Sequence, residues 1–117
     1  MSYWVSLECK DGNWAKVEIH SEGGTYALGG TDQAKLNVTY NYSWFYYHFL
    51  DEQEGIRWLD GKTAKDCISR LENAVEVLGT SRYDKDYWAA TPGNAGYVLN
   101  VLLGWARQHP DARFTAH

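Results

Sequence analysis

The sequence predicts a single α+β domain, residues 1–117, in which an antiparallel sheet of three to four strands precedes three helices. Alternating apolar and polar residues fill the first third of the chain, whereas later apolar residues recur at helical spacing. Strands that precede helices, rather than alternate with them, favour this class over parallel β–α–β units. A length of 117 residues is typical of one domain with its own core.

Four strands are predicted. Tyr3 to Cys9 and Trp14 to His20 flank the turn Lys10-Asp11-Gly12-Asn13, which is the pattern of a β-hairpin. Thr25 to Leu28 lies between paired glycines and predicts a third strand. The alternation in the fourth strand, Ala34 to Tyr40, is regular, and its inward side comprises Ala34, Leu36, Val38 and Tyr40.

Two helices are expected in the middle of the chain. The first begins at Trp44, with Ser43 as its cap, and ends near Leu50. The second follows a weak capping box of Thr63 and Asp66, and its apolar stripe consists of Cys67, Ile68, Leu71, Ala74, Val75 and Leu78. Gly79 is expected to end it.

A third helix begins at Thr91-Pro92, an N-cap followed by proline, and ends before His109-Pro110. One apolar face comprises Ala95, Val98, Leu99, Leu102, Leu103 and Ala106, and a second stripe comprises Tyr97, Val101 and Trp105. Such a helix is either central to the fold or covered by a partner subunit. Gly93 and Gly96 each disfavour a helix, so close packing is the favoured reason for their presence and approach of a ligand the alternative.

Composition excludes several classes of protein. A net charge of −4 argues against binding to duplex nucleic acid through a basic face. Cys9 and Cys67 lack metal-site spacing, so we expect both thiols to be reduced and buried, with no metal and no cofactor. The absence of a signal sequence and of an apolar span predicts a cytoplasmic protein that does not enter a membrane.

No catalytic motif is recognisable, so an enzyme is unsupported by the sequence. Gly61-Lys62-Thr63 resembles the end of a phosphate-binding loop. Such a loop also requires a glycine five positions before Gly61, and that position is Ile56. Simple capping by Thr63 is the favoured explanation. A weaker alternative is that Arg57, Lys62 and the helix start bind a phosphate without hydrolysing it.

Aromatic content is the main indication of function. The chain has six Trp and nine Tyr, and such side chains occur at interfaces and in ligand sites as well as in cores. A dense segment comprises Tyr40, Tyr42, Trp44, Phe45, Tyr46, Tyr47, Phe49 and Trp58, and some of Tyr42, Tyr46, Tyr47 and Trp58 should be exposed. The alternative for any one of these rings is packing in the core or between subunits.

Several strings occur together along nearly the whole chain: residues 23–31 (GGTYALGGT), 36–43 (LNVTYNYS), 61–64 (GKTA), and 86–88 (DYW) with 91–96 (TPGNAG). This combination resembles a family of small phage and prophage-type proteins. The resemblance implies a small non-catalytic product that binds a host factor or a signalling nucleotide and counters a defence system.

The leading hypothesis is a non-enzymatic binding protein, homo-oligomeric through the third helix or the aromatic segment, that sequesters a nucleotide-like small molecule. Its predicted ligand-binding residues are Tyr42, Trp44, Arg57, Lys62, Thr63, Tyr87, Trp88 and Asn94. The alternative is a protein–protein inhibitor of a host defence factor, with exposed Tyr and Trp as anchors.

Overall fold

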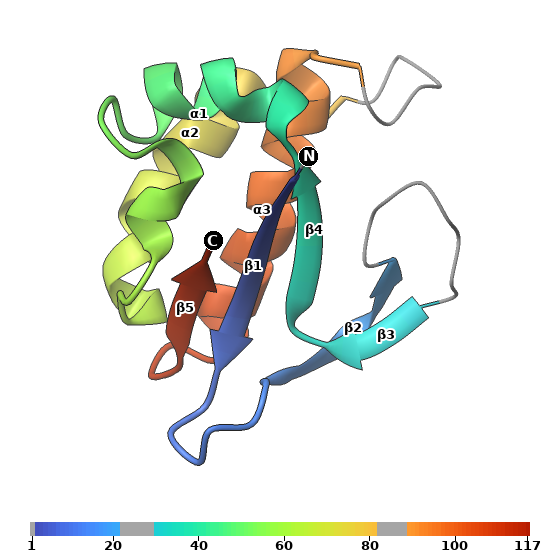
Figure 1. Ribbon diagram of the computed structural model, residues 1–117, viewed down its shortest axis with the longest axis vertical. Helices are drawn as coiled ribbons and strands as arrows, with labels where there is room; N and C mark the ends of the chain where they lie inside the picture. Colours follow the sequence, from blue (N-terminus) through green and yellow to red (C-terminus); the bar gives the residue numbers. More distant parts are fainter. Residues whose placement is uncertain (1, 22–29, 82–88) are drawn as a thin grey trace.

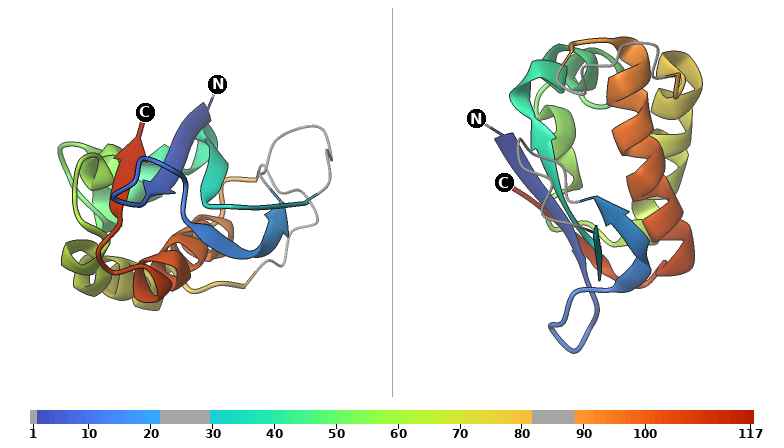
Figure 2. Two further views of the ribbon diagram at one scale, coloured as in Figure 1. Left: turned by 90° about the horizontal axis from the view of Figure 1, so that it is seen from below. Right: turned by 90° about the vertical axis from the view of Figure 1, so that its right-hand side faces the viewer.

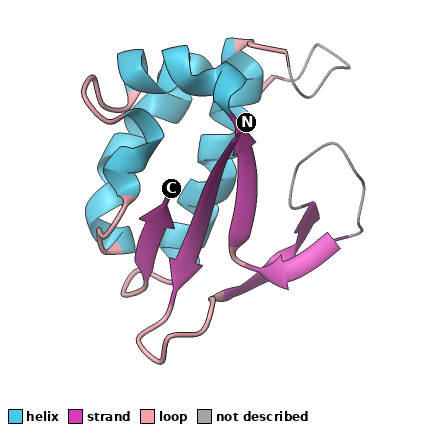
Figure 3. Cartoon of the chain, viewed as in Figure 1, coloured by secondary structure: helices cyan, strands magenta, loops and turns pink. Residues whose placement is uncertain are grey.

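Strands and helices lie in two layers of the molecule (Figure 1 and Figure 3). The computed structural model describes residues 2–21, 30–81 and 89–117. The elements are β1 (Ser2–Glu8), β2 (Lys16–Ser21), β3 (Gly30–Gln33), β4 (Lys35–Thr39), α1 (Ser43–Phe49), α2 (Ile68–Leu78), α3 (Pro92–Gln108) and β5 (Arg113–Ala116). Short 3₁₀ helices occur at η1 (Tyr40–Tyr42), η2 (Gly55–Leu59) and η3 (Ala64–Cys67). The predicted α+β class is confirmed.

β1 is the central strand of a three-stranded antiparallel sheet with the order β4-β1-β5. Val5 of β1 pairs with Leu36 of β4 on one side and with Ala116 of β5 on the other. The sequence does not predict β5, because four residues are too few to show an alternation and their partner strand lies at the other end of the chain. The sequence predicts a sheet that precedes all the helices, but β5 follows α3, so the sheet contains both ends of the chain.

The predicted hairpin of the first two strands forms only next to its turn. The Cys9 N–H donates to the Asn13 carbonyl at 2.8 Å, and Glu8 forms a single bridge with Trp14. β2 then diverges and pairs with β3 in a separate two-stranded sheet, while β1 pairs with β4 and β5. The third strand predicted at Thr25 to Leu28 lies outside the described residues, and the third strand of the structure begins at Gly30.

Ser43 does not cap α1, which corrects the sequence prediction. The chain turns earlier, at η1, where the Thr39 side chain accepts a hydrogen bond from the Asn41 N–H at 3.2 Å. Ser43 is the first residue of α1, and its Oγ instead hydrogen-bonds the Tyr3 hydroxyl at 2.7 Å. This bond ties the start of the helix to the central strand.

The two later helices begin differently. Thr91 caps α3 as predicted, since its side chain accepts a hydrogen bond from the Asn94 N–H at 3.1 Å. Thr63 makes no such bond, because the Asp66 N–H donates to the Thr63 carbonyl and the chain enters η3 before α2. The predicted capping box is therefore wrong, although the predicted end of α2 at Gly79 is correct.

Gly93 and Gly96 allow α3 to pack directly against the chain that leaves α2. A Cβ atom at Gly93 would overlap the Ser81 carbonyl oxygen, and one at Gly96 would overlap the Gly79 carbonyl oxygen. Backbone atoms cannot rotate away as side chains do, so only glycine fits at these two positions. Close packing, the favoured explanation from the sequence, accounts for both residues.

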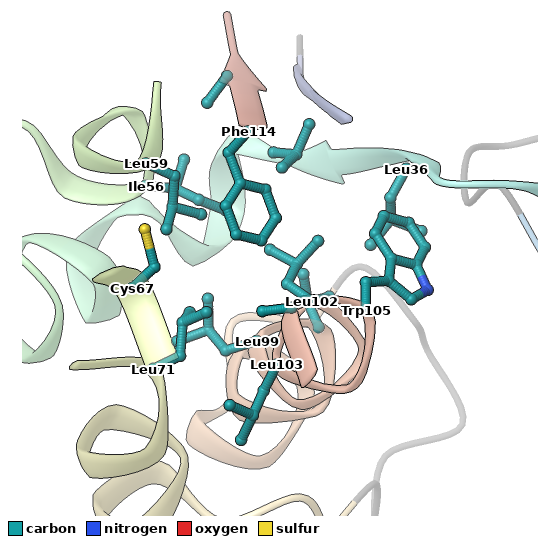
Figure 4. Close-up of a cluster of buried hydrophobic side chains, with 14 of the residues drawn as sticks. Leu36, Ile56, Leu59, Cys67, Leu71, Leu99, Leu102, Leu103, Trp105 and Phe114 are labelled. Carbon is teal, nitrogen blue, oxygen red and sulfur yellow. The ribbon is translucent and has the colours of Figure 1, made fainter. Parts of the chain in front are cut away.

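The core lies between the sheet and the helices, where side chains of α2, α3 and η2 surround Phe114 of β5 (Figure 4). Trp105, from the second stripe of α3, is buried within the chain and contacts the His20 ring at 5.0 Å between centroids. Val101 is half-buried and Tyr97 is exposed. Of the two alternatives for α3, the structure therefore shows the helix in a central position in the fold.

Candidate functional site

The aromatic segment divides between the core and the surface, but not as predicted. Tyr42 and Tyr46 are fully buried, and the Tyr46 hydroxyl donates to the Ala95 carbonyl at 3.0 Å. Tyr47 and Trp58 are half-buried. The rings that reach solvent are instead Trp44, which is 57% exposed, and Phe49. Trp44 stacks on His48 with 3.9 Å between ring centroids.

Two cations of the predicted site are already engaged with aromatic rings. Arg57 lies over the Tyr3 ring, 5.1 Å from its centroid. Lys62 Nζ donates to the Trp58 carbonyl at 2.6 Å and lies 4.5 Å from the centroid of that ring. These contacts hold both side chains against the protein surface, which makes them poor candidates for binding a phosphate.

The remaining predicted site residues are spread over the structure. Asn94 is buried at the start of α3, where its Nδ2 donates to the Ala89 carbonyl at 3.1 Å. Thr63 lies at the opposite side of the fold, beside β5. Tyr87 and Trp88 lie outside the described residues, so their role in ligand binding stays a prediction. Of the described members, Thr63 lines a hollow at the end of β1.

The start of the η3–α2 segment also lacks donors for an anion. The Ala64 N–H donates to the Ala112 carbonyl at 2.7 Å, and the Lys65 N–H donates to the Pro110 carbonyl at 2.9 Å. N–H groups at a helix start attract phosphate only when they have no other partner. The structure therefore offers no support for phosphate binding at this helix start.

A different surface brings exposed aromatic and polar side chains together: the outer face of the three-stranded sheet, which we call the open sheet face. Tyr3, Val5 and Leu7 of β1 point into the core, so Trp4 points outward and is 47% exposed. Among the described elements, α2 and α3 cover only the inner side of the sheet (Figure 2). Trp4 is thus an outward indole on the central strand, on the side of the sheet that no described helix covers.

Strand register gives the neighbours of Trp4 on this face. Asn37 of β4 is opposite Trp4 on one side, and His117 exchanges two backbone hydrogen bonds with Trp4, both at 3.0 Å, on the other. Residues paired across antiparallel strands project to the same side of a sheet. The next row along β1 contains Lys35, Ser6 and Thr115, and the row after that contains Trp14, Glu8, Arg113 and Thr63.

Hydrogen bonds order the polar residues of this face. Asn37 Nδ2 donates to Ser2 Oγ at 2.7 Å, and the hydroxyls of Ser6 and Thr115 are hydrogen-bonded to each other. Lys35 Nζ lies over the Trp14 ring at 4.8 Å, which links the β1–β2 turn to the face.

The charge of the open sheet face differs in sign from that of the chain. Across its three rows it carries two cations, Lys35 and Arg113, and one carboxylate, Glu8, so the formal charge is +1 on a chain of net charge −4. An anionic ligand is therefore less disfavoured on this face than the overall composition suggests.

A hollow of about 560 Å³ opens at the Glu8 end of the face, where the β1–β2 turn meets the start of β5. Its charged lining residues are Glu8, Lys10, Lys65, Asp111 and Arg113, and Thr63 adds a hydroxyl. We call it the basic hollow, because three cations outnumber two carboxylates. Thr63 is the one described residue of the predicted site that lies here.

The two thiols give no sign of a nucleophile. Cys67 is buried in the core, and burial raises the pKa of its thiol to about 11. Its Sγ donates to the Thr63 carbonyl at 3.6 Å. Cys9 is a half-buried free thiol at the edge of the basic hollow, so only Cys67 is buried as predicted.

Comparisons with family models, with curated proteins and with solved structures find no match to this chain. Within the described part of the chain, no helix is both long and apolar enough to cross a membrane.

Sequence reasoning missed Trp4, Trp14 and Lys35 as candidate functional residues. The alternation of Tyr3, Val5 and Leu7 does indicate that Trp4 faces away from the core. It does not reveal that β1 is the central strand, because the pairing with β5 is not visible in the sequence. An outward Trp on an edge strand is unremarkable, whereas one at the centre of a sheet face is a binding candidate.

Proposed function

We propose that this protein is a non-enzymatic binding protein that recognises a nucleotide-like ligand on the open sheet face, with Trp4 as the residue on which a base stacks. The observation that carries the proposal is the position of Trp4, which is exposed on the central strand of a sheet face that no described helix covers and is flanked by hydrogen-bonding groups.

Stacking fits this geometry for a physical reason. The exposed indole of Trp4 is planar, as a base is, and aromatic stacking contributes about 1–3 kcal/mol per base. Asn37, His117 and the paired hydroxyls of Ser6 and Thr115 surround the ring with hydrogen-bonding groups. The bases of single strands and free nucleotides expose their faces, whereas those of a duplex are stacked on one another, so the ligand class excludes duplex nucleic acid.

The resemblance to phage and prophage-type proteins supports a biological setting for the proposal. A small protein without catalytic machinery acts on a signalling nucleotide by sequestering it. In that setting the protein works in the host cytoplasm and counters a defence system by lowering the free concentration of the ligand.

The test compares two exposed tryptophans. Binding of nucleoside monophosphates and of a hexathymidylate strand is measured by calorimetry for wild type, Trp4→Ala and Trp44→Ala. We expect Trp4→Ala to weaken binding about 5-fold to 150-fold, the equivalent of one lost stack. Trp44→Ala, which removes an indole of similar exposure from α1, should leave binding within about two-fold of wild type. Equal affinity of wild type and Trp4→Ala for every ligand would refute the proposal.

The alternative function, inhibition of a host defence protein, is favoured by the rings on α1. Trp44 and Phe49 are exposed on one short helix, and aromatic anchors of this kind dominate many protein interfaces. The same rings are a candidate contact in a homo-oligomer. Under this alternative Trp44→Ala, rather than Trp4→Ala, would abolish inhibition or change the sedimentation coefficient.

A further inference from the structure

Lys10 and Arg113 of the basic hollow are cations that form no ion pair with a described carboxylate. Among the described residues, no carboxylate oxygen lies within ion-pair distance of either side chain, whereas Arg70 pairs with Asp51 and Arg107 pairs with Glu72. Lys10 and Arg113 nonetheless line the same hollow, as does Thr63, which is the bridge partner of Arg113. Two unpaired cations that converge on one hollow attract an anion.

The third cation of the hollow is only weakly engaged. Lys65 Nζ lies 3.5 Å from an Asp111 carboxylate oxygen, and both side chains are mostly exposed. Exposed pairs of this kind contribute little to stability, so a bound anion can compete for Lys65. Glu8 and Asp111 reduce the formal charge of the hollow to +1 and restrict it to ligands with more than one negative charge or with additional contacts.

The hollow is continuous with the open sheet face. Glu8 of β1 and its partner Arg113 of β5 belong to both surfaces. Glu8 lies four residues along β1 from Trp4. Four residues of a strand span about 14 Å. That distance equals about four nucleotides at the stacked spacing of 3.4 Å, which is more than a mononucleotide can cover.

We infer that the basic hollow binds phosphate groups and that the ligand is a short single-stranded oligonucleotide running along β1 from Trp4 to the hollow. The assignment of both contacts to one ligand rests on the proposed function. Arg113 offers a planar pair of N–H donors to a phosphate, and Lys10 offers a mobile point charge from the β1–β2 turn. The face therefore distinguishes an oligonucleotide from a mononucleotide by length.

The experiment measures affinity for thymidine strands of one to six nucleotides at several salt concentrations, for wild type, Lys10→Ala, Arg113→Ala and Lys16→Ala. Lys16 is an exposed cation of β2 that does not line the hollow, so Lys16→Ala is the matched control for charge. Wild-type affinity should rise with length and level off near four nucleotides. Each hollow variant should lose about ten-fold on the hexamer, and change little on the monomer.

Salt dependence gives a second readout. Each phosphate contact on a single strand contributes about −0.7 to the slope of log affinity against log salt. Lys10→Ala and Arg113→Ala should each make the slope shallower by about 0.7, and Lys16→Ala should not. Direct binding of tripolyphosphate to wild type, lost in Lys10→Ala and Arg113→Ala, would confirm the anion site without any base.

The two proposals fail in different ways. If Lys10→Ala and Arg113→Ala match Lys16→Ala in how affinity depends on strand length and on salt, the hollow does not bind phosphate, whatever the effect of Trp4→Ala. If Trp4→Ala binds every strand as wild type does while the hollow variants remain weak, the stacking site is refuted and the anion site stands.

Discussion

Gly96→Ala should destabilise the protein even though alanine is the better helix former. In the interior of α3 the substitution gains about 1 kcal/mol of helix propensity. The added Cβ would overlap the Gly79 carbonyl oxygen and crowd Leu78 Cβ at 3.0 Å, so α3 must move away from the end of α2. Overpacking costs about 1–3 kcal/mol, and contact with backbone places this case at the upper end. The expected net loss is about 2 kcal/mol, or about 8 °C in Tm for a chain of this length.

Gly104→Ala is the matched control, since Gly104 lies in the same helix with nothing within 4 Å of a built Cβ. It should raise Tm by about 4 °C, which is the helix propensity alone. Thermal unfolding followed by far-UV circular dichroism measures both variants. If Gly96→Ala is stabilised as much as Gly104→Ala, the close approach of α3 to Gly79 is wrong.

Two further predictions follow from caps and burial. Thr91→Ala should lower the free energy of unfolding in urea by about 1 kcal/mol, because it removes the cap of α3. Thr63→Ala loses no capping bond and should lower it by less than about 0.5 kcal/mol. Equal losses would contradict the assignment of the caps. The folded-state pKa of Cys67, about 11, exceeds its ordinary value of 9.0, so stability is intact below pH 9 and falls between pH 9 and 11. The loss, measured by urea unfolding, should reach about 3 kcal/mol and be absent in Cys67→Ala. An unchanged pH dependence of stability in that variant would exclude this thiol as its source.

Elements with a strong local pattern could be predicted from the sequence. In the strand predicted from Ala34 to Tyr40, the alternate residues Ala34, Leu36 and Val38 are buried, whereas Tyr40 begins η1 and is half-buried. Thr91-Pro92 marks the start of α3, and Gly79 marks the end of α2. In each case the decisive interactions lie within a few residues of one another.

What could not be predicted depends on pairing between distant segments. β5 forms because Phe114 and Ala116 fill the core beside β1, and its outer edge is covered by Lys62, whose carbonyl accepts from the Phe114 N–H at 2.9 Å. β4 and β5 occupy the two edges of β1, so β1 is central, and β2, which follows the bridge between Trp14 and Glu8 of β1, pairs with β3 in a second sheet. The same tertiary pairing turns Trp4 from an ordinary outward residue into the centre of a face.

The predicted ligand site illustrates the same limit. Tyr42 lies in a segment dense in rings, yet η1 directs it into the core, where it is fully buried. Arg57 and Lys62 satisfy their charge over the rings of Tyr3 and Trp58 rather than toward a ligand. Composition indicates an excess of aromatic side chains, but only the tertiary fold shows which of them reach solvent.

Fluorine NMR of protein containing 5-fluorotryptophan tests the central claim most directly, because each indole gives its own resonance. The Trp4 signal is assigned as the one missing from Trp4→Phe, and the Trp44 signal as the one missing from Trp44→Phe. On titration with a hexathymidylate strand, the Trp4 resonance should shift or broaden in proportion to the bound fraction while the Trp44 resonance stays in place. A saturated complex in which the Trp4 resonance does not move would contradict the account.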